Sequence, residues 1–415
     1  MRFNSLSRGG RSVFALLLVA GLVFIVVDLF YQAQSEHLSP QSLANLKFAE
    51  DSSFLSALKT YPTYWPPFYP TVLRLFGQLG IPIRKFNQLC FYFILLLIGY
   101  YTKHYIKNIH GIYIIAFLVL LHTNYVNIYQ QVSEPLFVLL ALVMMLIMLQ
   151  YRHSPTISKL VWLAVLTSMS CLTRFFAFFW TLPICLVYIW WNNSHDTIQG
   201  KVLRTGVFLG IVGLLVSPWL IHLRVLTGSF SGMERFGSRG FGAYGHLLTG
   251  QDTAYTNIKT SLKTIVVDFL SPYRYASHRV INISSLSMLE TCMAIIAFLL
   301  LVLMFLIIGP VLYRSFRSHI EGRFVDFAFA DKIIPFHFAL LYFISIIVMW
   351  TLTNNDPIYT RFMYPMYLFA VLSIFSLYSS IKESTIYKKL PFILLYWLLL
   401  GVNCYKDLKD LFTRV

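Results

Sequence analysis

The chain has 415 residues, of which 57% are hydrophobic and only 12% charged, and its formal net charge is +16. A soluble protein carries about 25% charged residues, and no water-soluble fold could cover this much apolar surface, so the composition indicates a membrane protein. Much of the basic excess lies in short loops between apolar runs, which favours cationic loops at one membrane face over nucleic-acid binding. The five cysteines are scattered without a CxxC pair, so we expect small core residues, not a metal or disulfide framework.

Apolar runs of the length of a transmembrane helix recur along the chain. They predict an all-α integral membrane protein, one polytopic domain over residues 1–415 with about eleven transmembrane helices. The first run follows a basic leader, but because many more follow it, we expect an uncleaved helix rather than a signal peptide. The runs cover residues 12–31, 87–102, 111–127, 134–151, 160–173, 175–191, 205–223, 289–313, 335–353, 363–381 and 390–404.

A cytoplasmic N-terminus makes the short loops obey the positive-inside rule. Two long segments, 32–86 and 224–288, then face outward. The first contains six prolines and amphipathic stretches, which predicts interfacial helices lying along the membrane surface. The second opens rich in glycine, as expected for a mobile loop over an outward cleft.

Charged and titratable groups at the outward ends of the runs need a reason, because charge is costly beside lipid. Arginine holds phosphate through paired donors, and a carboxylate accepts a proton from a hydroxyl, so this combination suits a reaction on an anionic lipid. The candidates at this level are Asp28, Glu36, Glu134, Arg174, Arg224, Arg361 and His222.

Simpler roles stay open for several of these residues. Arg174 and Arg361 could extend to the lipid headgroups by snorkelling. Glu134 stands before a proline at a helix start, where an acid complements the helix dipole. Asp28 could cap the end of the first span.

Residues 64–70 read Tyr-Trp-Pro-Pro-Phe-Tyr-Pro. Four further segments of interest are spread over most of the chain: 133–137, 172–175, 217–220 with Gly228 and Phe230, and 361–365. In this order, the five segments resemble those of polyprenyl-phosphate-dependent glycosyltransferases with the GT-C fold, and residues 64–70 are similar to that family's WPP segment.

The resemblance implies a GT-C-like bundle that moves a sugar from a polyprenyl-phosphate donor to an acceptor hydroxyl at the outward face, with inversion. The family carries its catalytic carboxylate in the first outward loop, where Glu36 stands at the matching position. Glu replaces the usual Asp there, and Pro40 replaces the usual aromatic residue, so Asp28 and the pair Glu50 and Asp51 remain alternative bases.

The resemblance also suggests roles for the remaining candidates. Arg174 and Arg361 would stabilise the departing lipid phosphate, with Arg224 and His222 close to it. The expected substrate-binding residues are Glu134, Trp65, Tyr69 and Tyr364. The chain has no glycine-rich phosphate loop and no DxD, which fits a lipid-linked rather than a nucleotide-linked donor. We expect no metal or other cofactor, partners limited to the bilayer, the lipid-linked sugar and an acceptor, and a location in a bacterial plasma membrane.

Three other functions share these features. A lipid-linked sugar flippase or transporter would have a similar helix count, but with its charges near the bilayer midplane. A surface-polysaccharide polymerase or ligase also uses outward arginines, and the second outward segment is rich in them. An inactive scaffold derived from the enzyme fold is compatible with the Glu-for-Asp departure at Glu36.

Overall fold

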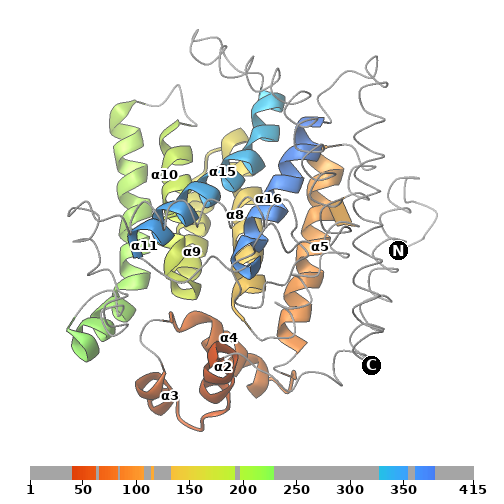
Figure 1. The fold of residues 1–415 in the computed structure, drawn as a ribbon. Helices are drawn as coiled ribbons and strands as arrows, with labels where there is room; N and C mark the ends of the chain where they lie inside the picture. Colours follow the sequence, from red (N-terminus) through yellow and green to blue (C-terminus); the bar gives the residue numbers. More distant parts are fainter. Residues whose placement is uncertain are drawn as a thin grey trace, which may run out of the picture.

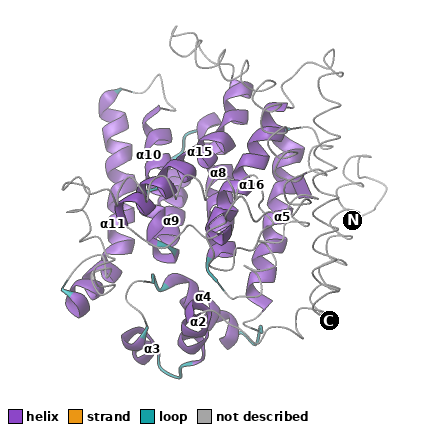
Figure 2. Cartoon of the chain, in the orientation of Figure 1, coloured by secondary structure: helices purple, strands orange, loops and turns teal. Residues whose placement is uncertain are grey.

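The computed structural model describes residues 40–61, 65–82, 85–106, 114–115, 132–191, 197–228, 327–353 and 360–378. All regular structure within these residues is helical, which confirms the predicted all-α class for this part of the chain (Figure 2). The predicted spans 12–31, 289–313 and 390–404, and nearly all of 111–127, lie outside the described residues.

Three short helices form a layer across one end of a bundle of longer helices (Figure 1). The layer consists of α2 (Pro40–Glu50), α3 (Phe54–Thr60) and α4 (Phe68–Gln78), in the segment predicted to contain interfacial helices. A short non-helical segment separates α2 from α3. In it, Asp51 Oδ1 accepts from the Ser53 backbone N–H, and Ser53 caps α3. We call the bundle end beneath this layer the α2–α4 end.

The bundle is built from α5 (Phe86–Tyr105), α8 (Glu134–His153), α9 (Ile157–Thr173), α10 (Thr181–Trp191), α11 (Ile198–Thr227), α15 (Phe327–Thr353) and α16 (Thr360–Tyr378). Helix α8 lies at its centre and packs against α5, α9, α15 and α16. Most side chains of α8 are buried, and this helix supplies the largest share of the continuous hydrophobic core. The residues that α8 carries at its two ends are therefore held firmly.

The helices of the bundle begin at either of its two ends, so that sequence-distant helix ends meet (Figure 1). Helix α8 starts and α9 ends at the α2–α4 end, where a 3-10 turn, η3 (Phe175–Phe178), leads into α10. Helix α16 ends at the opposite end, where Ser376 hydrogen-bonds Tyr101 in the last turns of α5. Its first turn, with Arg361 and Tyr364, consequently lies towards the α2–α4 end, about 20 Å further along its axis.

Helix bounds follow the predicted apolar runs with three main differences. Helix α15 begins at Phe327, eight residues before the predicted run 335–353. The run 175–191 is not one helix: Arg174 has an extended backbone, and η3 separates it from α10. The run 205–223 is longer than predicted, because α11 begins after the Thr197 cap and continues past Pro218 to Thr227. Gly228 ends α11 with φ +78°, a left-handed conformation that glycine adopts without strain. Arg224, placed at the start of a loop from the sequence, is thus helical.

Two of the described helices, α8 and α11, are long and apolar enough to cross a bilayer. They differ in their surroundings, since most of α8 is buried whereas most of the apolar window of α11 is exposed. Large exposed side chains follow α11 along its length, at Ile198, Leu203, Leu209, Leu214, Ile221 and Val225. Such a surface is typical of a helix that faces lipid or another protein.

Candidate functional site

An ion pair joins the start of α8 to the end of α9. Arg174 Nη1 lies 2.6 Å from Glu134 Oε1, and the Glu134 side chain is only 1% exposed against 19% for Arg174. Pro135 favours the helix start at this place, and the extended backbone of Arg174 ends α9, so local sequence fixes both residues at the same end. The carboxylate is thus inside the bundle, and the guanidinium forms the accessible side of the pair.

Unsatisfied hydroxyls flank this ion pair in the sequence. Ser133 directly precedes Glu134, and Ser170 lies one turn before Arg174. Both hydroxyl oxygens are buried without a hydrogen-bond partner in the described part of the chain. Buried hydroxyls are usually hydrogen-bonded, so their concentration here is typical of a site that binds water or a polar ligand.

A second polar link connects the α2–α4 layer with the chain just before the Glu134–Arg174 ion pair. The Tyr69 hydroxyl donates to Asn87 Oδ1 at 2.9 Å, and Asn87 Nδ2 donates to the Val132 carbonyl at 3.0 Å. Burial raises the pKa of Tyr69 well above its usual value, so the hydroxyl stays protonated and remains a donor. Because Val132 is two residues before Glu134, the link fixes the layer against the ion pair.

Aromatic residues enclose the ion pair from the side of α15. The buried Tyr342 lies within electrostatic range of both Glu134 and Arg174. Its ring makes edge contacts with Phe176 of η3 and with Trp180, at centroid distances of 4.9 Å and 4.7 Å. The indole of Trp180 donates to the Phe338 carbonyl of α15 at 2.9 Å. The wall beside the pair is therefore rigid and apolar.

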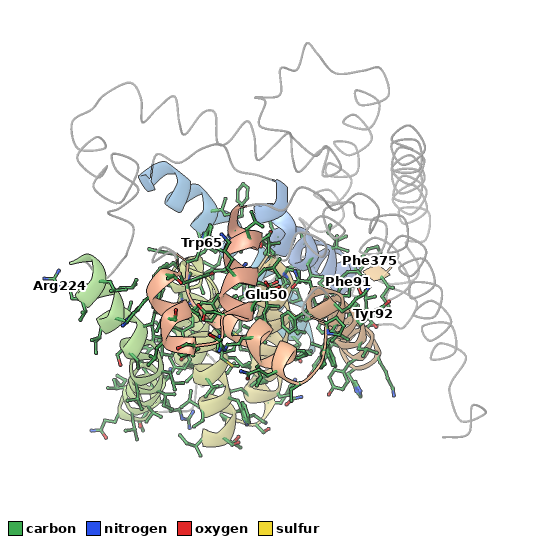
Figure 3. The ribbon with its side chains drawn as sticks, turned by 90° about the horizontal axis from the view of Figure 1, so that it is seen from below. Glu50, Trp65, Phe91, Tyr92, Arg224 and Phe375 are labelled. Atoms are coloured by element: carbon green, nitrogen blue, oxygen red, sulfur yellow. The ribbon has the colours of Figure 1, made fainter. Side chains whose placement is uncertain are left out.

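The α2–α4 layer has a small core of its own. Phe48, Ala57 and Tyr61 are buried there, and Trp65 packs against Tyr61 with ring centroids 6.2 Å apart. Arg74 of α4 donates to the carbonyls of Phe48 and Ser52, which ties α4 to the end of α2. Trp65 is half-buried at the edge of this core and faces the viewer in Figure 3, where Glu50 is exposed at the end of α2.

The predicted substrate-binding aromatics thus differ in accessibility. Trp65 keeps part of its ring exposed and could stack on a sugar. Tyr69 is 1% exposed and its hydroxyl is bound to Asn87, so it anchors the layer and does not offer a surface for stacking.

The predicted phosphate-binding residues Arg224 and His222 lie in the last two turns of α11. Arg224 is exposed, donates to the Gly228 carbonyl and projects outward from the helix end, away from Trp65 (Figure 3). His222 is half-buried, and its ring is tilted against that of Trp219 with ring centroids 5.4 Å apart. The ring nitrogens His222 Nε2 and Trp219 Nε1 are buried without a hydrogen-bond partner among the described residues.

The remaining predicted residues lie wholly or partly outside the described residues. The backbones of Arg361 and Tyr364 belong to the first turns of α16, but their side chains are outside the described part. Glu36 and Asp28 lie outside the described residues, with Glu36 four positions before α2 in the sequence. Within the described residues, no three His, Cys, Asp or Glu side chains form a group that could hold a metal ion.

Sequence reasoning missed Asn87 and Tyr342. Asn87 opens an apolar run and looks like a residue of a loop boundary, although a polar amide in the first turn of such a run is a signal for a buried hydrogen bond. Tyr342 has no distinguishing signal, because most of the apolar runs of this chain contain at least one tyrosine.

Comparison of the chain with protein families, with characterised proteins and with solved structures finds no match. The site therefore has to be interpreted from its own geometry and chemistry.

Proposed function

We propose that the chain is a membrane glycosyltransferase that moves a sugar from a polyprenyl-phosphate donor to an acceptor hydroxyl at the outward face. One observation carries the proposal: three of the five family-like segments meet at one end of the bundle. The segment with Tyr69, the segment with Glu134 and the segment with Arg174 are far apart in the sequence, yet the Tyr69–Asn87–Val132 link and the ion pair bring them together.

The exposed surface of the bundle and the distribution of its cations support the membrane location in this proposal. The exposed apolar side chains of α11 match a lipid environment, and similar exposed residues occur on α5, α9, α10 and α15. The end of the bundle opposite α2–α4 carries the cations of the last turns of α5 and α8 and the first turns of α9, α11 and α15. By the positive-inside rule that end faces the cytoplasm and the α2–α4 end faces outward.

The ion pair gives Arg174 the geometry of a phosphate anchor. Glu134 fixes the guanidinium without reaching the surface itself, so a phosphate arriving at the α2–α4 end meets cationic N–H groups before it meets the carboxylate. Charge on the lipid phosphate grows as the glycosidic bond breaks, and a preorganised guanidinium stabilises that charge. Arg361, at the same end of α16, is the proposed second cation.

The reaction is a direct displacement. Glu36 takes the proton from the acceptor hydroxyl, whose oxygen attacks the anomeric carbon, and the lipid phosphate leaves with the electron pair of the broken C–O bond. Attack from the side opposite the leaving group inverts the anomeric configuration. No oxidant or reductant is needed, and the proposal requires no metal.

Transfer of labelled sugar from polyprenyl-phosphate donors, measured in membranes, tests this function. We expect transfer by the wild type and less than about one hundredth of it, the usual contribution of a general base, in Glu36→Gln at equal abundance. Glu50→Gln tests the alternative base, and Lys103→Gln, at the opposite end of the bundle, is the control for a change of charge. Loss only in Glu50→Gln would reassign the base, and absence of transfer from every donor would sink the enzyme proposal and favour a transporter.

A further inference from the structure

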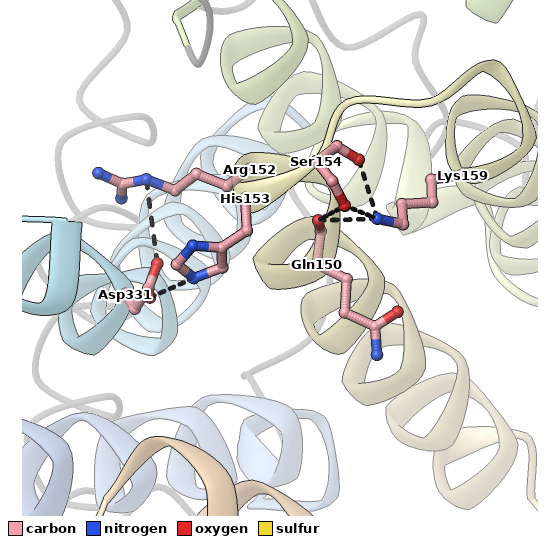
Figure 4. A network of polar contacts seen from close by, with 6 residues as sticks. All are labelled: Gln150, Arg152, His153, Ser154, Lys159 and Asp331. Atoms are coloured by element: carbon pink, nitrogen blue, oxygen red, sulfur yellow. Dashed lines mark hydrogen bonds and ion pairs between the residues drawn. The ribbon is translucent and has the colours of Figure 1, made fainter.

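A second polar cluster lies at the end of the bundle opposite α2–α4, and the proposed reaction does not use it. Asp331, near the start of α15 and 6% exposed, accepts from His153 Nε2 at 2.7 Å and lies 3.9 Å from Arg152 Nε (Figure 4). Both partners belong to the last turn of α8, where cations complement the helix dipole. Arg152 turns its Nε towards Asp331 and its two terminal nitrogens away from it (Figure 4).

A polar contact between α10 and α15 lies within range of the same arginine. The Tyr188 hydroxyl and His337 Nδ1 are 2.5 Å apart, and the charge of Arg152 acts on both residues. His337 is exposed, although it lies six residues beyond Asp331, about 9 Å further into the apolar part of α15. An exposed histidine at that depth is costly in a lipid environment, and the contact with the Tyr188 hydroxyl offsets part of that cost.

The surface below His337 is apolar. Leu340 and Ile344, 40% and 45% exposed, follow His337 at spacings of three and seven residues and therefore continue the same face of α15. On neighbouring α10, Val187 and Trp190 are also exposed. A polar head of Arg152, Tyr188 and His337 thus stands above an apolar stripe, which is the distribution of a phospholipid from headgroup to acyl chain.

The charge at this end selects the headgroup. The described residues there comprise six cations, Lys103, Arg152, Lys159, Lys201, Arg204 and Lys332, and one carboxylate, Asp331. Six minus one leaves +5 before any histidine is protonated. A negatively charged headgroup is attracted to such a surface, whereas a zwitterionic one gains little.

We propose that Arg152, Tyr188 and His337 form a binding site for one anionic phospholipid of the inner leaflet. The phosphate lies against the terminal nitrogens of Arg152 and the Tyr188–His337 contact, and an acyl chain follows Leu340 and Ile344. The proposal does not depend on glycosyl transfer, only on a bilayer around the bundle. The site lies at the junction of α8, α10 and α15. It therefore differs from a general attraction of anionic lipid to the positive charge of this end.

Native mass spectrometry of the purified full chain tests the site. The protein is titrated with phosphatidylglycerol or with phosphatidylcholine of the same acyl chains, and the bound lipids are counted. We expect one phosphatidylglycerol to be retained and Arg152→Gln to weaken its binding about fivefold, the effect of one cation at an anionic lipid surface. Lys201→Gln removes a cation at the same end, outside the cluster, and should leave the retained lipid in place.

Two further variants separate binding from folding. Arg152→Gln combined with Asp331→Asn leaves no buried acid without its arginine, and His337→Gln leaves the Asp331 contacts intact. Both should bind the lipid several-fold more weakly while the protein stays folded. Equal retention in wild type, Arg152→Gln and His337→Gln, or an equal loss in Lys201→Gln, would overturn the site and leave only a general attraction of charges.

Discussion

Arg174 Nη1 and Glu134 Oε1 lie 2.6 Å apart, with the carboxylate almost completely enclosed and the guanidinium partly accessible. The pair joins the start of α8 to the end of α9 beneath the α2–α4 layer. Its two members were expected from the sequence to bind different parts of a substrate. Their contact means that a change of either residue removes an ion-pair partner of the other, so the two residues are tested together.

Removing one member of this pair should destabilise the protein strongly. We expect Arg174→Gln to lower the free energy of unfolding by about 3–5 kcal/mol, because a buried carboxylate then lacks its cation. The double variant Glu134→Gln with Arg174→Gln should recover most of that loss. Thermal unfolding in detergent of the four proteins of the cycle measures the coupling, and additive effects would contradict the buried pair.

Tyr69→Phe should reduce both stability and transfer. The Asn87 carbonyl oxygen would lose its donor in a buried place, at a cost of about 1–3 kcal/mol, and the link from α4 to Val132 would weaken. Tyr61→Phe is the matched control, since the Tyr61 hydroxyl donates to Asn45 Oδ1 at 2.7 Å inside the layer itself.

The two tyrosine variants should therefore lose similar stability but differ in activity. Transfer assayed well below the unfolding temperature should fall in Tyr69→Phe and persist in Tyr61→Phe. If both variants keep full activity, the Tyr69 link serves stability alone.

Leu214→Lys tests the environment of α11. Leu214 is 73% exposed near the middle of that helix, so a water-soluble bundle would accept lysine there without cost. A lysine at the centre of a transmembrane helix costs about 2.5–3.5 kcal/mol on insertion scales. We expect the variant to insert poorly, as measured by membrane fractionation. Val225→Lys, at the equally exposed helix end, should insert normally because lysine there extends to the headgroups.

Arg74→Ala should loosen the layer without unfolding the bundle. The variant loses the donors to the Phe48 and Ser52 carbonyls that hold the end of α2. Limited proteolysis should then cut faster between α2 and α3, and Lys59→Ala, a neighbouring basic residue on α3, should be cut at the wild-type rate. Unchanged cutting in Arg74→Ala would show that hydrophobic contacts alone hold the layer.

Much of the described fold follows from the periodicity of apolar runs. The runs 134–151 and 87–102 match α8 and α5 within three residues at each end, because an uninterrupted apolar stretch of this length has no alternative to a helix in lipid. The runs 160–173 and 175–191 already separate at Arg174, but the 3-10 turn η3 over Phe175–Phe178 was not predicted. The ion pair of Arg174 with Glu134 was not predicted either, because it joins residues forty positions apart that no local pattern connects.

The candidate site was predictable in its location but not in its connections. The alternation of helix directions places Glu134 and Arg174 at one end, and that follows from counting spans. Whether Tyr69 points to a ligand or into the core depends on the packing of α4 on α5, which is decided by Asn87. Arg224 is a further example of a connection that the sequence does not reveal. It was predicted at the start of a loop, but α11 continues to Thr227, and Arg224 donates to the Gly228 carbonyl at the end of the helix.

The ring of Trp180 touches aromatic rings from three other helices: Phe137 of α8, Phe338 and Tyr342 of α15, and Phe369 of α16. Residues 40–228 and 327–378 are thereby joined through side chains as well as through the peptide chain. Two separately synthesised polypeptides, divided between those ranges, would keep these ring contacts as a basis for association.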